Sequence, residues 1–269
     1  MRLLFIGDVF GRTGREAIQK HLPKLQNDLD IDFTIVDGDN AAHGRGITEK
    51  ICKELYDLNV DCITSGDHVW DQREIMSYIS RDKNLIRPMN YKAETPGVGS
   101  WEKQLPDGRS LVVLHLQCRV FMKPIEDPFA AADEFLKTNK ISKNKAIFVD
   151  FHGEATSEKM ALGQYLDGRV SAVVGSHTHI PTADCQILPN GTGYQTDAGM
   201  TGDYDSVIGA QKEGAIARLT KDTPRPLQPA EGEATLCGTF IEIDDMTGLT
   251  LKIEPIRIGG RLSQALPGL

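Results

Sequence analysis

Five short segments of the sequence each place a carboxylate, amide or imidazole side chain directly after a run of apolar residues. The candidate residues are Asp8, Asp39, Asn40, Asp67, His68, His152, His177 and His179. Taken alone, an aspartate after a strand is usually a cap or turn residue, and a single histidine is usually structural. Together, carboxylates and imidazoles suit Mn, Fe or Zn better than Ca or Mg. The set therefore predicts a transition-metal site without thiolate ligands.

The segment "VVGSHTH" ends with two histidines separated by one threonine, His177 and His179. In extended backbone, residues two apart point to the same side, with Cα atoms roughly 6.6–6.8 Å apart. Two imidazoles so placed could each approach one of two metal ions that lie ~3.5–4 Å apart. The simpler alternative is a pair of surface histidines in a loop.

The apolar runs that precede these residues have the length and composition of buried strands. They cover 2–7, 32–38, 61–66, 110–116, 145–151 and 170–175. Helix-type sequence lies between them, and this alternation predicts parallel strands joined by right-handed crossovers. Because ligands bind at the carboxyl ends of such strands, residues far apart in sequence are expected to converge there.

Local signals predict further elements. Thr13 with Glu16, and Asp71 with Glu74, have the spacing of capping boxes at helix starts. Helical spacing covers 133–137 and 157–166, and two strand-like runs around "DDMTG" predict an antiparallel hairpin over 236–258. The proline-containing stretch 221–234 is expected to be an exposed loop.

Bulk composition limits the function classes. The 269 residues have a net charge of −8, so a broad basic groove and an extended nucleic-acid surface are not expected. No apolar run is long enough to span a membrane. The five cysteines are scattered without a CxxC motif, which favours free thiols in a cytoplasmic protein. We expect one domain over 1–269 and leave a homo-oligomer open.

The ligand segments resemble the motif series of calcineurin-like metallophosphoesterases. They are "GD" at 7–8, "GDN" at 38–40, "GDH" at 66–68, "FH" at 151–152 and "GSHTH" at 175–179. More closely, the chain resembles the bacterial YmdB-like branch of that superfamily. The matching blocks are "GDVFGRTGR" (7–15), "NAAHGRGIT" (40–48), "HVWD" (68–71), "FHGEATSEK" (151–159) and "DAGMTGDYDS" (197–206).

The resemblance implies an α/β fold of four layers, in which two mixed β-sheets pack together between outer helices. It also implies two divalent or mixed-valence transition-metal ions, with Fe or Mn favoured and Zn as an alternative. The implied activity is phosphodiester hydrolysis, with a small phosphodiester or a 2′,3′- or 3′,5′-cyclic nucleotide as the substrate.

Roles follow from the matched positions. The first ion would be held by Asp8, Asp39, Asn40 and His179. The second would be held by Asp39, Asp67, His152 and His177, so that Asp39 bridges the two. A metal-bridging hydroxide would attack the phosphorus, and His68 would act as an acid or charge stabiliser.

The chain departs from the family pattern in three places. Val9 and Phe10 follow Asp8, so the histidine of the superfamily's first motif is missing, and Asn40 is expected to fill the gap. Asp39 stands where the branch usually has glutamate, and Asp67 stands where it usually has asparagine. The third carboxylate adds negative charge to the site, so these departures bear on metal choice and rate.

Other polar residues have weaker signals. His43 and Arg45 follow Asn40 in a glycine-containing loop and are candidates for substrate contact. Glu154 would support a metal ligand or begin a helix. His115 is expected to be structural, and His21 is expected on a helix surface.

Three alternatives to a two-metal phosphodiesterase remain. One is a phosphomonoesterase. Another is a regulatory protein that binds nucleotide with little turnover, which the Asp39 and Asp67 departures keep open. A metal-dependent amidohydrolase is disfavoured because its His-x-His pair usually lies on the first strand, whereas this pair comes late.

Overall fold

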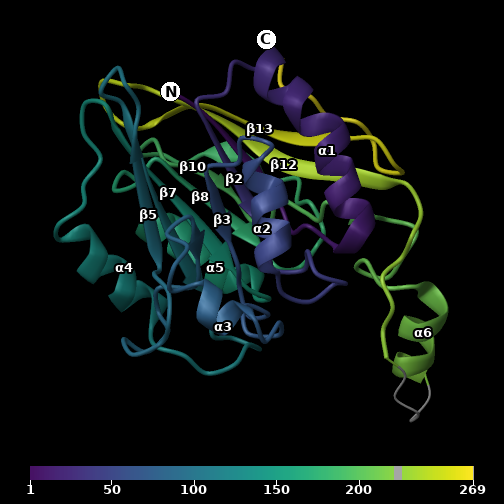
Figure 1. Ribbon diagram of the computed structural model, residues 1–269. Helices are drawn as coiled ribbons and strands as arrows, with labels where there is room; N and C mark the ends of the chain where they lie inside the picture. Colours follow the sequence, from purple (N-terminus) through teal and green to yellow (C-terminus); the bar gives the residue numbers. More distant parts are fainter. Residues whose placement is uncertain (221–225, 269) are drawn as a thin grey trace.

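The chain forms two mixed β-sheets packed face to face in the computed structural model, which describes residues 1–220 and 226–268 (Figure 1). The first sheet has the order β11-β12-β1-β2-β3-β4, with β13 paired to β12. Its strands are β1 (Arg2–Ile6), β2 (Phe33–Asp37), β3 (Cys62–Thr64), β4 (Leu85–Ile86), β11 (Gly202–Asp203), β12 (Ala234–Ile243) and β13 (Thr250–Ile258). The predicted hairpin over 236–258 is confirmed as the antiparallel pair β12–β13.

The second sheet has the order β5-β6-β7-β8-β10-β9. Its strands are β5 (Ser100–Gln104), β6 (Ser110–Gln117), β7 (Lys145–His152), β8 (Ala172–Ser176), β9 (Gln186–Ile187) and β10 (Gly193–Gln195). All six predicted strands form, and they pair in parallel as β1–β2–β3 and as β6–β7–β8. They divide between two sheets, as the family resemblance implied.

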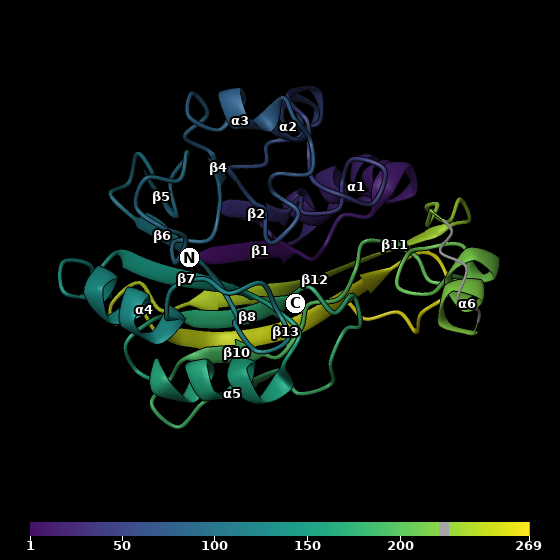
Figure 2. The ribbon, with the colours of Figure 1, turned by 90° about the horizontal axis from the view of Figure 1, so that it is seen from below.

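Helices cover the outer face of each sheet (Figure 2). On the first sheet lie α1 (Gly11–Asp28), α2 (Glu49–Tyr56) and α3 (Ile75–Tyr78); on the second lie α4 (Pro128–Leu136) and α5 (Thr156–Tyr165). The remaining helix, α6 (Lys212–Thr220), projects to one side of the sheets. The expected four-layer architecture is therefore confirmed.

Alternation along the strands explains why the apolar runs are nearly continuous. In β1, Leu3 and Phe5 belong to the core between the sheets, whereas Leu4 and Ile6 belong to the core under the helices. Phe5 meets Phe148 of β7 across the sheets, with ring centroids 5.1 Å apart. Both faces are buried, so both need apolar side chains.

The face of β7 that meets the first sheet changes character along its length. Phe148 lies in the apolar core, but Asp150 and His152, two and four residues further on, are fully buried polar groups. Because side chains two apart share a face, this change marks the point where the core between the sheets becomes a polar site.

Both predicted capping boxes are wrong. Helix α1 begins at Gly11 without a side-chain cap, and Thr13 lies buried within it. The start is instead set by long-range backbone bonds, in which Phe10 N–H donates to the Thr201 carbonyl and Gly11 N–H to the Asn40 carbonyl. Helix α3 begins only at Ile75, also without a side-chain cap.

The expected loop over 221–234 falls partly on residues 221–225, which lie outside the described residues. From 226 to 233 the chain is irregular and mostly exposed, with one bridge between Pro229 and Ala210. This stretch passes beside the site described next.

Candidate metal centre

The predicted ligands converge at the carboxyl ends of β1, β2, β3, β7 and β8 and form two neighbouring groups. In the first group, His179 Nε2 lies 3.2 Å from Asn40 Oδ1 and 3.8 Å from Asp8 Oδ1. Asp8, Asn40 and His179 are all buried. These three side chains come from the ends of three different strands, as the sequence predicted.

In the second group, His152 Nε2 lies 3.2 Å from His177 Nδ1, 3.3 Å from Asp67 Oδ1 and 3.4 Å from Asp39 Oδ2. Donor atoms about 2.0–2.2 Å from a common ion would lie roughly 3.0–3.4 Å apart. The donor types and spacing therefore fit a transition metal. Asp39 and Asn40 are adjacent in the chain, so they connect the two groups.

A buried network missed by the sequence analysis orients His152. Its Nδ1 lies 2.9 Å from Ser176 Oγ and 3.3 Å from Asp37 Oδ2. The Ser176 hydroxyl donates to Asp150 Oδ1 at 2.8 Å, so it accepts from His152 Nδ1–H. This tautomer leaves Nε2 free to face the other donors, which is the usual arrangement for a metal-binding histidine.

The predicted structural role of His115 agrees with its position in the same network. The side chain is fully buried, and its Nδ1 lies 3.1 Å from Asp150 Oδ2. Burial raises the pKa of Asp150, but the charge and hydrogen bond of His115 outweigh it, and the pKa lies below its usual value. His115 therefore stabilises the charged form of the Asp150 carboxylate, which accepts the hydrogen bond of the Ser176 hydroxyl.

The rationale from extended backbone was wrong for His177 and His179. Strand β8 ends at Ser176, and the two histidines have φ of 94° and 69°, in the left-handed region. His177 turns toward His152 and Asp67, whereas His179 turns toward Asn40 and Asp8. The pair still divides between the two groups, but through a tight turn.

Side chains from other elements hold this turn, which we call the histidine turn (residues 176–179). The Asp8 carboxylate accepts from His177 N–H at 3.1 and 3.0 Å. Asp197 Oδ2 accepts from both the backbone and the hydroxyl of Thr178. Buried Lys159 donates to Asp197 Oδ2 at 2.7 Å and to the Ser176 carbonyl at 2.6 Å. A buried ion pair thus clamps the turn.

The second ring nitrogen of His179 is also fixed. Nδ1 lies 2.8 Å from the carbonyl of Ile208, which can only accept, so Nδ1 carries the proton and Nε2 faces the first group. The hydroxyl of Tyr204 donates to the carbonyl of His179 at 2.9 Å. Tyr204 belongs to the matched block 197–206, so this block helps to hold His179 in place.

The electrostatics show a surplus of negative charge. Burial, followed by the charge of Asp37, raises the pKa of Asp8 to about 7. Burial also disfavours the charged form of His152, but Asp37, Asp39 and Asp67 outweigh it and raise the pKa well above the usual value. Buried carboxylates that compete for protons in this way are suited to a bound cation, which replaces those protons.

His68 lies at the edge of the second group, with its side chain 23% exposed. Its backbone N–H donates to Asp39, and its Nδ1 lies 2.8 Å from Asp71 Oδ2. Asp71 therefore orients the imidazole rather than capping a helix. The three-residue spacing of His68 and Asp71 in "HVWD" permits this contact, whereas the sequence pattern had paired Asp71 with Glu74 as a capping box.

A pocket of about 320 Å³ opens beside both groups. His43 and Arg45, the predicted substrate contacts, are exposed and line it, as does Glu154. Glu154 Oε2 lies 3.5 Å from His177 Nε2, and it does not cap α5, because the N-cap residue is Ala155.

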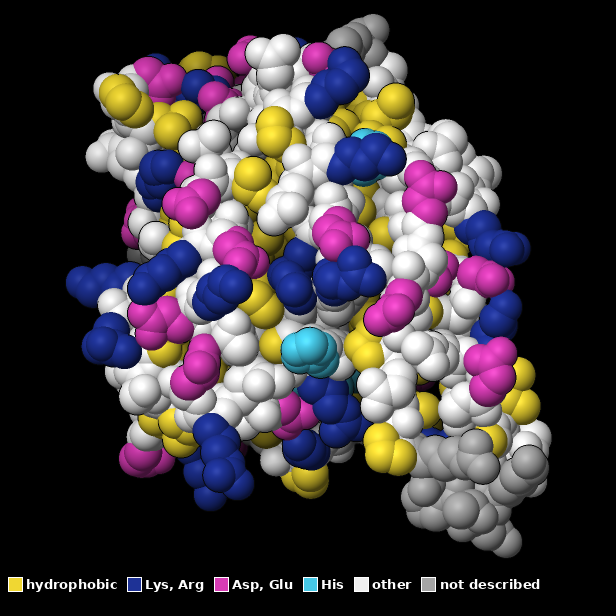
Figure 3. Space-filling view, turned by 45° about the vertical axis from the view of Figure 1, so that its right-hand side comes forward, with side chains coloured by type: hydrophobic (Ala, Val, Ile, Leu, Met, Phe, Trp, Pro, Cys, Tyr) yellow, Lys and Arg dark blue, Asp and Glu magenta, His cyan; other side chains and the backbone are white. Residues whose placement is uncertain are grey.

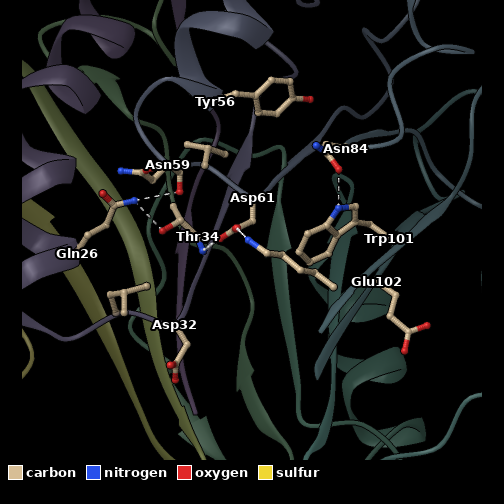
Figure 4. A pocket seen from close by; sticks show the side chains of 12 residues that line it. Gln26, Asp32, Thr34, Tyr56, Asn59, Asp61, Asn84, Trp101 and Glu102 are labelled. Carbon is tan, nitrogen blue, oxygen red and sulfur yellow. Dashed lines mark hydrogen bonds and ion pairs between the residues drawn. The ribbon is translucent and has the colours of Figure 1, made fainter. Parts of the chain in front are cut away.

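A larger cavity of about 770 Å³ lies elsewhere, between α1, α2 and β5 (Figure 4). Three pairs of its polar side chains are hydrogen-bonded to one another: Lys103 with Asp61, Trp101 with Asn84, and Gln26 with Thr34. The metal-capable clusters among the described residues all lie at the other site. Size therefore does not identify the functional pocket here.

On the face shown in Figure 3, basic and acidic side chains are interspersed. Among the helices of the described residues, none has the length and apolar character that a membrane crossing requires.

Comparisons with known proteins show the family to which the chain belongs. Residues 4–256 match the family of YmdB-like proteins. A Bacillus subtilis (strain 168) protein named 2′,3′-cyclic-nucleotide 2′-phosphodiesterase is 49% identical over 258 residues, covering 96% of this chain and 97% of its own length.

Two solved structures are similar over at least 93% of their length. A hypothetical protein from Thermus thermophilus has a TM-score of 0.91 and 41% identity, with 97% of this chain and 100% of that chain covered. A structure described as a novel phosphatase from Mycoplasma pneumoniae has a TM-score of 0.90 and 33% identity, with 96% and 93% covered. The chain is thus an enzyme of the YmdB-like family, whose relatives include proteins named as a phosphodiesterase and a phosphatase.

Proposed function

We propose that the chain is a two-metal phosphodiesterase that hydrolyses 2′,3′-cyclic nucleotides. The observation that carries the proposal is the pair of donor groups, joined through Asp39 and Asn40, beside a pocket of about 320 Å³. The name of the Bacillus subtilis relative supports the choice of substrate.

Asp8, Asp39, Asn40 and His179 would hold one ion, and Asp39, Asp67, His152 and His177 the other. The carboxylate and imidazole donors favour Fe or Mn, with Zn as the alternative. Two such ions lower the pKa of a water molecule and neutralise charge that develops on the phosphoryl oxygens.

The protein's own side chains would orient the imidazoles of the site and protonate the leaving oxygen of the substrate. His68, held by Asp71 at the rim of the pocket, is suited to protonate the leaving oxygen or to stabilise its charge. Arg45 Nη1 lies 3.8 Å from Asp71 Oδ2, so the guanidinium lies beside the same carboxylate that orients His68. The hydrogen bonds to Asp71 and Ser176 keep the imidazoles of His68 and His152 in one orientation.

The balance of charge favours a diester over a monoester. Asp8, Asp39 and Asp67 offset the charge of the bound ions, and Arg45 is the only Lys or Arg among the described residues that line the pocket. A monoester dianion carries one more negative charge than a diester and gains more from additional cationic groups. A singly charged cyclic diester is therefore the less demanding ligand.

The test is a substrate panel on one manganese-loaded preparation. kcat/KM would be measured for a 2′,3′-cyclic nucleotide, a 3′,5′-cyclic nucleotide, bis(p-nitrophenyl) phosphate and p-nitrophenyl phosphate. We expect the 2′,3′-cyclic nucleotide to be hydrolysed best. A preference of roughly tenfold or more for the monoester, about 1.4 kcal/mol in transition-state binding, would instead identify a phosphatase.

A further inference from the structure

The residues that line the pocket beside the metal centre are of two chemically different kinds. One set carries the donors and the acid candidate, Asn40, His68, His177 and His179. Another set is apolar and consists of Phe10, Ile208, Ala210, Leu227 and Pro229. We call these five residues the apolar wall. Neither a phosphoryl group nor a metal ion makes favourable contacts with an apolar surface.

Ile208 is the most unusual member of the apolar wall. It has φ of 46°, a left-handed conformation that β-branched residues rarely adopt, and its side chain is 55% exposed. Its carbonyl accepts a hydrogen bond from the Nδ1–H of His179, and mutual backbone hydrogen bonds between Val207 and Ala210 close the turn around it. An asparagine adopts this left-handed backbone more readily than an isoleucine does. Contact with a bound ligand would explain why an exposed isoleucine stands at this position.

Phe10 is the buried aromatic member of the apolar wall, with 9% of its surface exposed. Its ring meets His179 edge-on, with centroids 5.5 Å apart. A Cβ atom at Gly44 or Gly209, both with positive φ, would approach the ring to 2.7 or 2.6 Å. The two glycines therefore let the backbone pack closely against the ring near Cγ and near Cζ, and these contacts fix its position.

Leu227 completes the apolar wall from the chain segment that follows α6. Its side chain is 39% exposed, and the neighbouring backbone is held by bonds from Ala230 N–H to the Gly209 carbonyl and from Gln211 N–H to the Gln228 carbonyl. An exposed leucine and an exposed isoleucine thus lie on a supported backbone within one small pocket of about 320 Å³.

We propose that the apolar wall binds the nucleobase of the substrate while the metal centre binds its cyclic phosphate. The assignment rests on the proposed function, because the phosphate places the nucleoside next to His179. A pocket of this size suits a small ligand. Every base has an apolar face that can pack on such a surface, so the apolar wall selects nucleosides over base-free diesters and discriminates little between bases.

The test compares each nucleotide with a substrate that lacks only the base. kcat/KM would be measured for 2′,3′-cyclic AMP and 2′,3′-cyclic CMP against methyl ribofuranoside 2,3-cyclic phosphate, with manganese loaded. We expect the native protein to prefer both nucleotides by roughly tenfold or more, the range for a modest apolar contact. Leu227→Ser and Ile208→Asn should each reduce that preference several-fold. Equal rates with and without the base in the native protein would overturn the proposal.

A matched control is Leu251→Ser, which changes a 61% exposed leucine on β13 and should keep the native preference. Metal content is measured for every variant, because Ile208 also bonds to His179. If Ile208→Asn loses metal, Leu227→Ser alone decides: an unchanged preference in that variant contradicts the proposal.

Binding separates this proposal from the proposed function. Calorimetry would compare 3′-AMP with ribose 3-phosphate on the metal-loaded protein, without any turnover. If no cyclic substrate is hydrolysed, the proposed function fails. Tighter binding of 3′-AMP that Leu227→Ser abolishes would still support the nucleobase subsite, whereas equal affinities would refute it.

Discussion

Asp67 shows how a single side chain sets the charge of the site. Its Oδ1 lies 3.3 Å from His152 Nε2 and 3.4 Å from His177 Nδ1. Burial raises the pKa of Asp67, but the hydrogen bonds of His152 and His177 outweigh it and hold the pKa below its usual range. The side chain therefore carries a full negative charge where the YmdB-like branch usually has a neutral asparagine.

Asp67→Asn tests this departure. We expect metal affinity to fall by roughly tenfold or more, the scale of other changes around metal ligands, because one anionic donor becomes neutral. Activity per bound ion should stay equal or rise, since a less neutralised ion is a stronger Lewis acid. Metal titration measures the affinity, and kinetics on the same metal-loaded preparation measure the activity per bound ion. Asp28→Asn, which changes an exposed carboxylate, is the control. Unchanged affinity with lost activity would reveal a catalytic role for the carboxylate.

His68→Ala tests the assigned acid. Turnover should fall by roughly 10²–10⁴, the range for a positioned acid or base, while metal content stays near that of the native protein. His21→Ala, on α1, removes an imidazole away from the site and should change neither. Because His68 also lies near Asp39 and Asp67 in a metal-capable cluster, loss of metal in His68→Ala would make it a ligand instead.

At the scale of elements, the histidine turn depends on a buried ion pair from two other segments. Lys159 comes from α5 and is 1% exposed, and Asp197 follows β10 and is fully buried. Asp197 also accepts from Gly199 N–H and from Thr178. The left-handed backbone of His177 and His179 is thus maintained by contacts distant in sequence.

Asp197→Ala should destabilise the fold by about 3–5 kcal/mol, because it leaves the Lys159 charge buried and unpaired. The double variant Asp197→Ala with Lys159→Met removes both charges and should lose less stability than the single one. Urea denaturation gives the free energies of unfolding. Manganese titration reports whether the histidine turn still holds His177 and His179 in place. The double variant should still bind manganese more weakly than the native protein, because Thr178 loses its acceptor. Equal stabilities of the two variants would argue against a coupled pair.

At the scale of the whole molecule, the site joins the two sheets. Asp8, Asp39, Asn40 and Asp67 follow strands of the first sheet, whereas His152, His177 and His179 belong to or follow strands of the second. Bound ions would therefore link the sheets and stabilise the folded chain, since the unfolded chain cannot present the same ligands.

Manganese should therefore saturate at two ions per chain and raise the thermal midpoint. At a free concentration about 100 times the Kd, the stabilisation is about 2.7 kcal/mol per site, and each kcal/mol shifts Tm by roughly 2–4 °C for a chain of about this size. Elemental analysis and thermal melts before and after chelation measure both. Asp8→Ala should reduce the shift. Saturation at one ion, or an unchanged Tm, would contradict a two-metal site.

The sequence by itself determined the six buried strands, their parallel pairing and the residues at their carboxyl ends, but it did not predict β4, β5, β9, β10 and β11. These features follow from local patterns: a buried strand needs apolar side chains on both faces, and the carboxyl ends of parallel strands share one edge. The local pattern alone therefore identifies one group of candidate ligands: Asp8, Asp39, Asn40, Asp67, His152, His177 and His179.

Only the tertiary structure decided how these residues are held. His152 meets Asp37 across 115 positions and Ser176 across 24, and His177 meets Asp8 across 169. Such contacts depend on how two sheets pack, which local spacing does not encode. For the same reason Asp71 bonds to His68 instead of capping a helix, and the histidine turn is left-handed instead of extended. A local pattern states what a segment favours, but long-range hydrogen bonds in a buried site outweigh that preference.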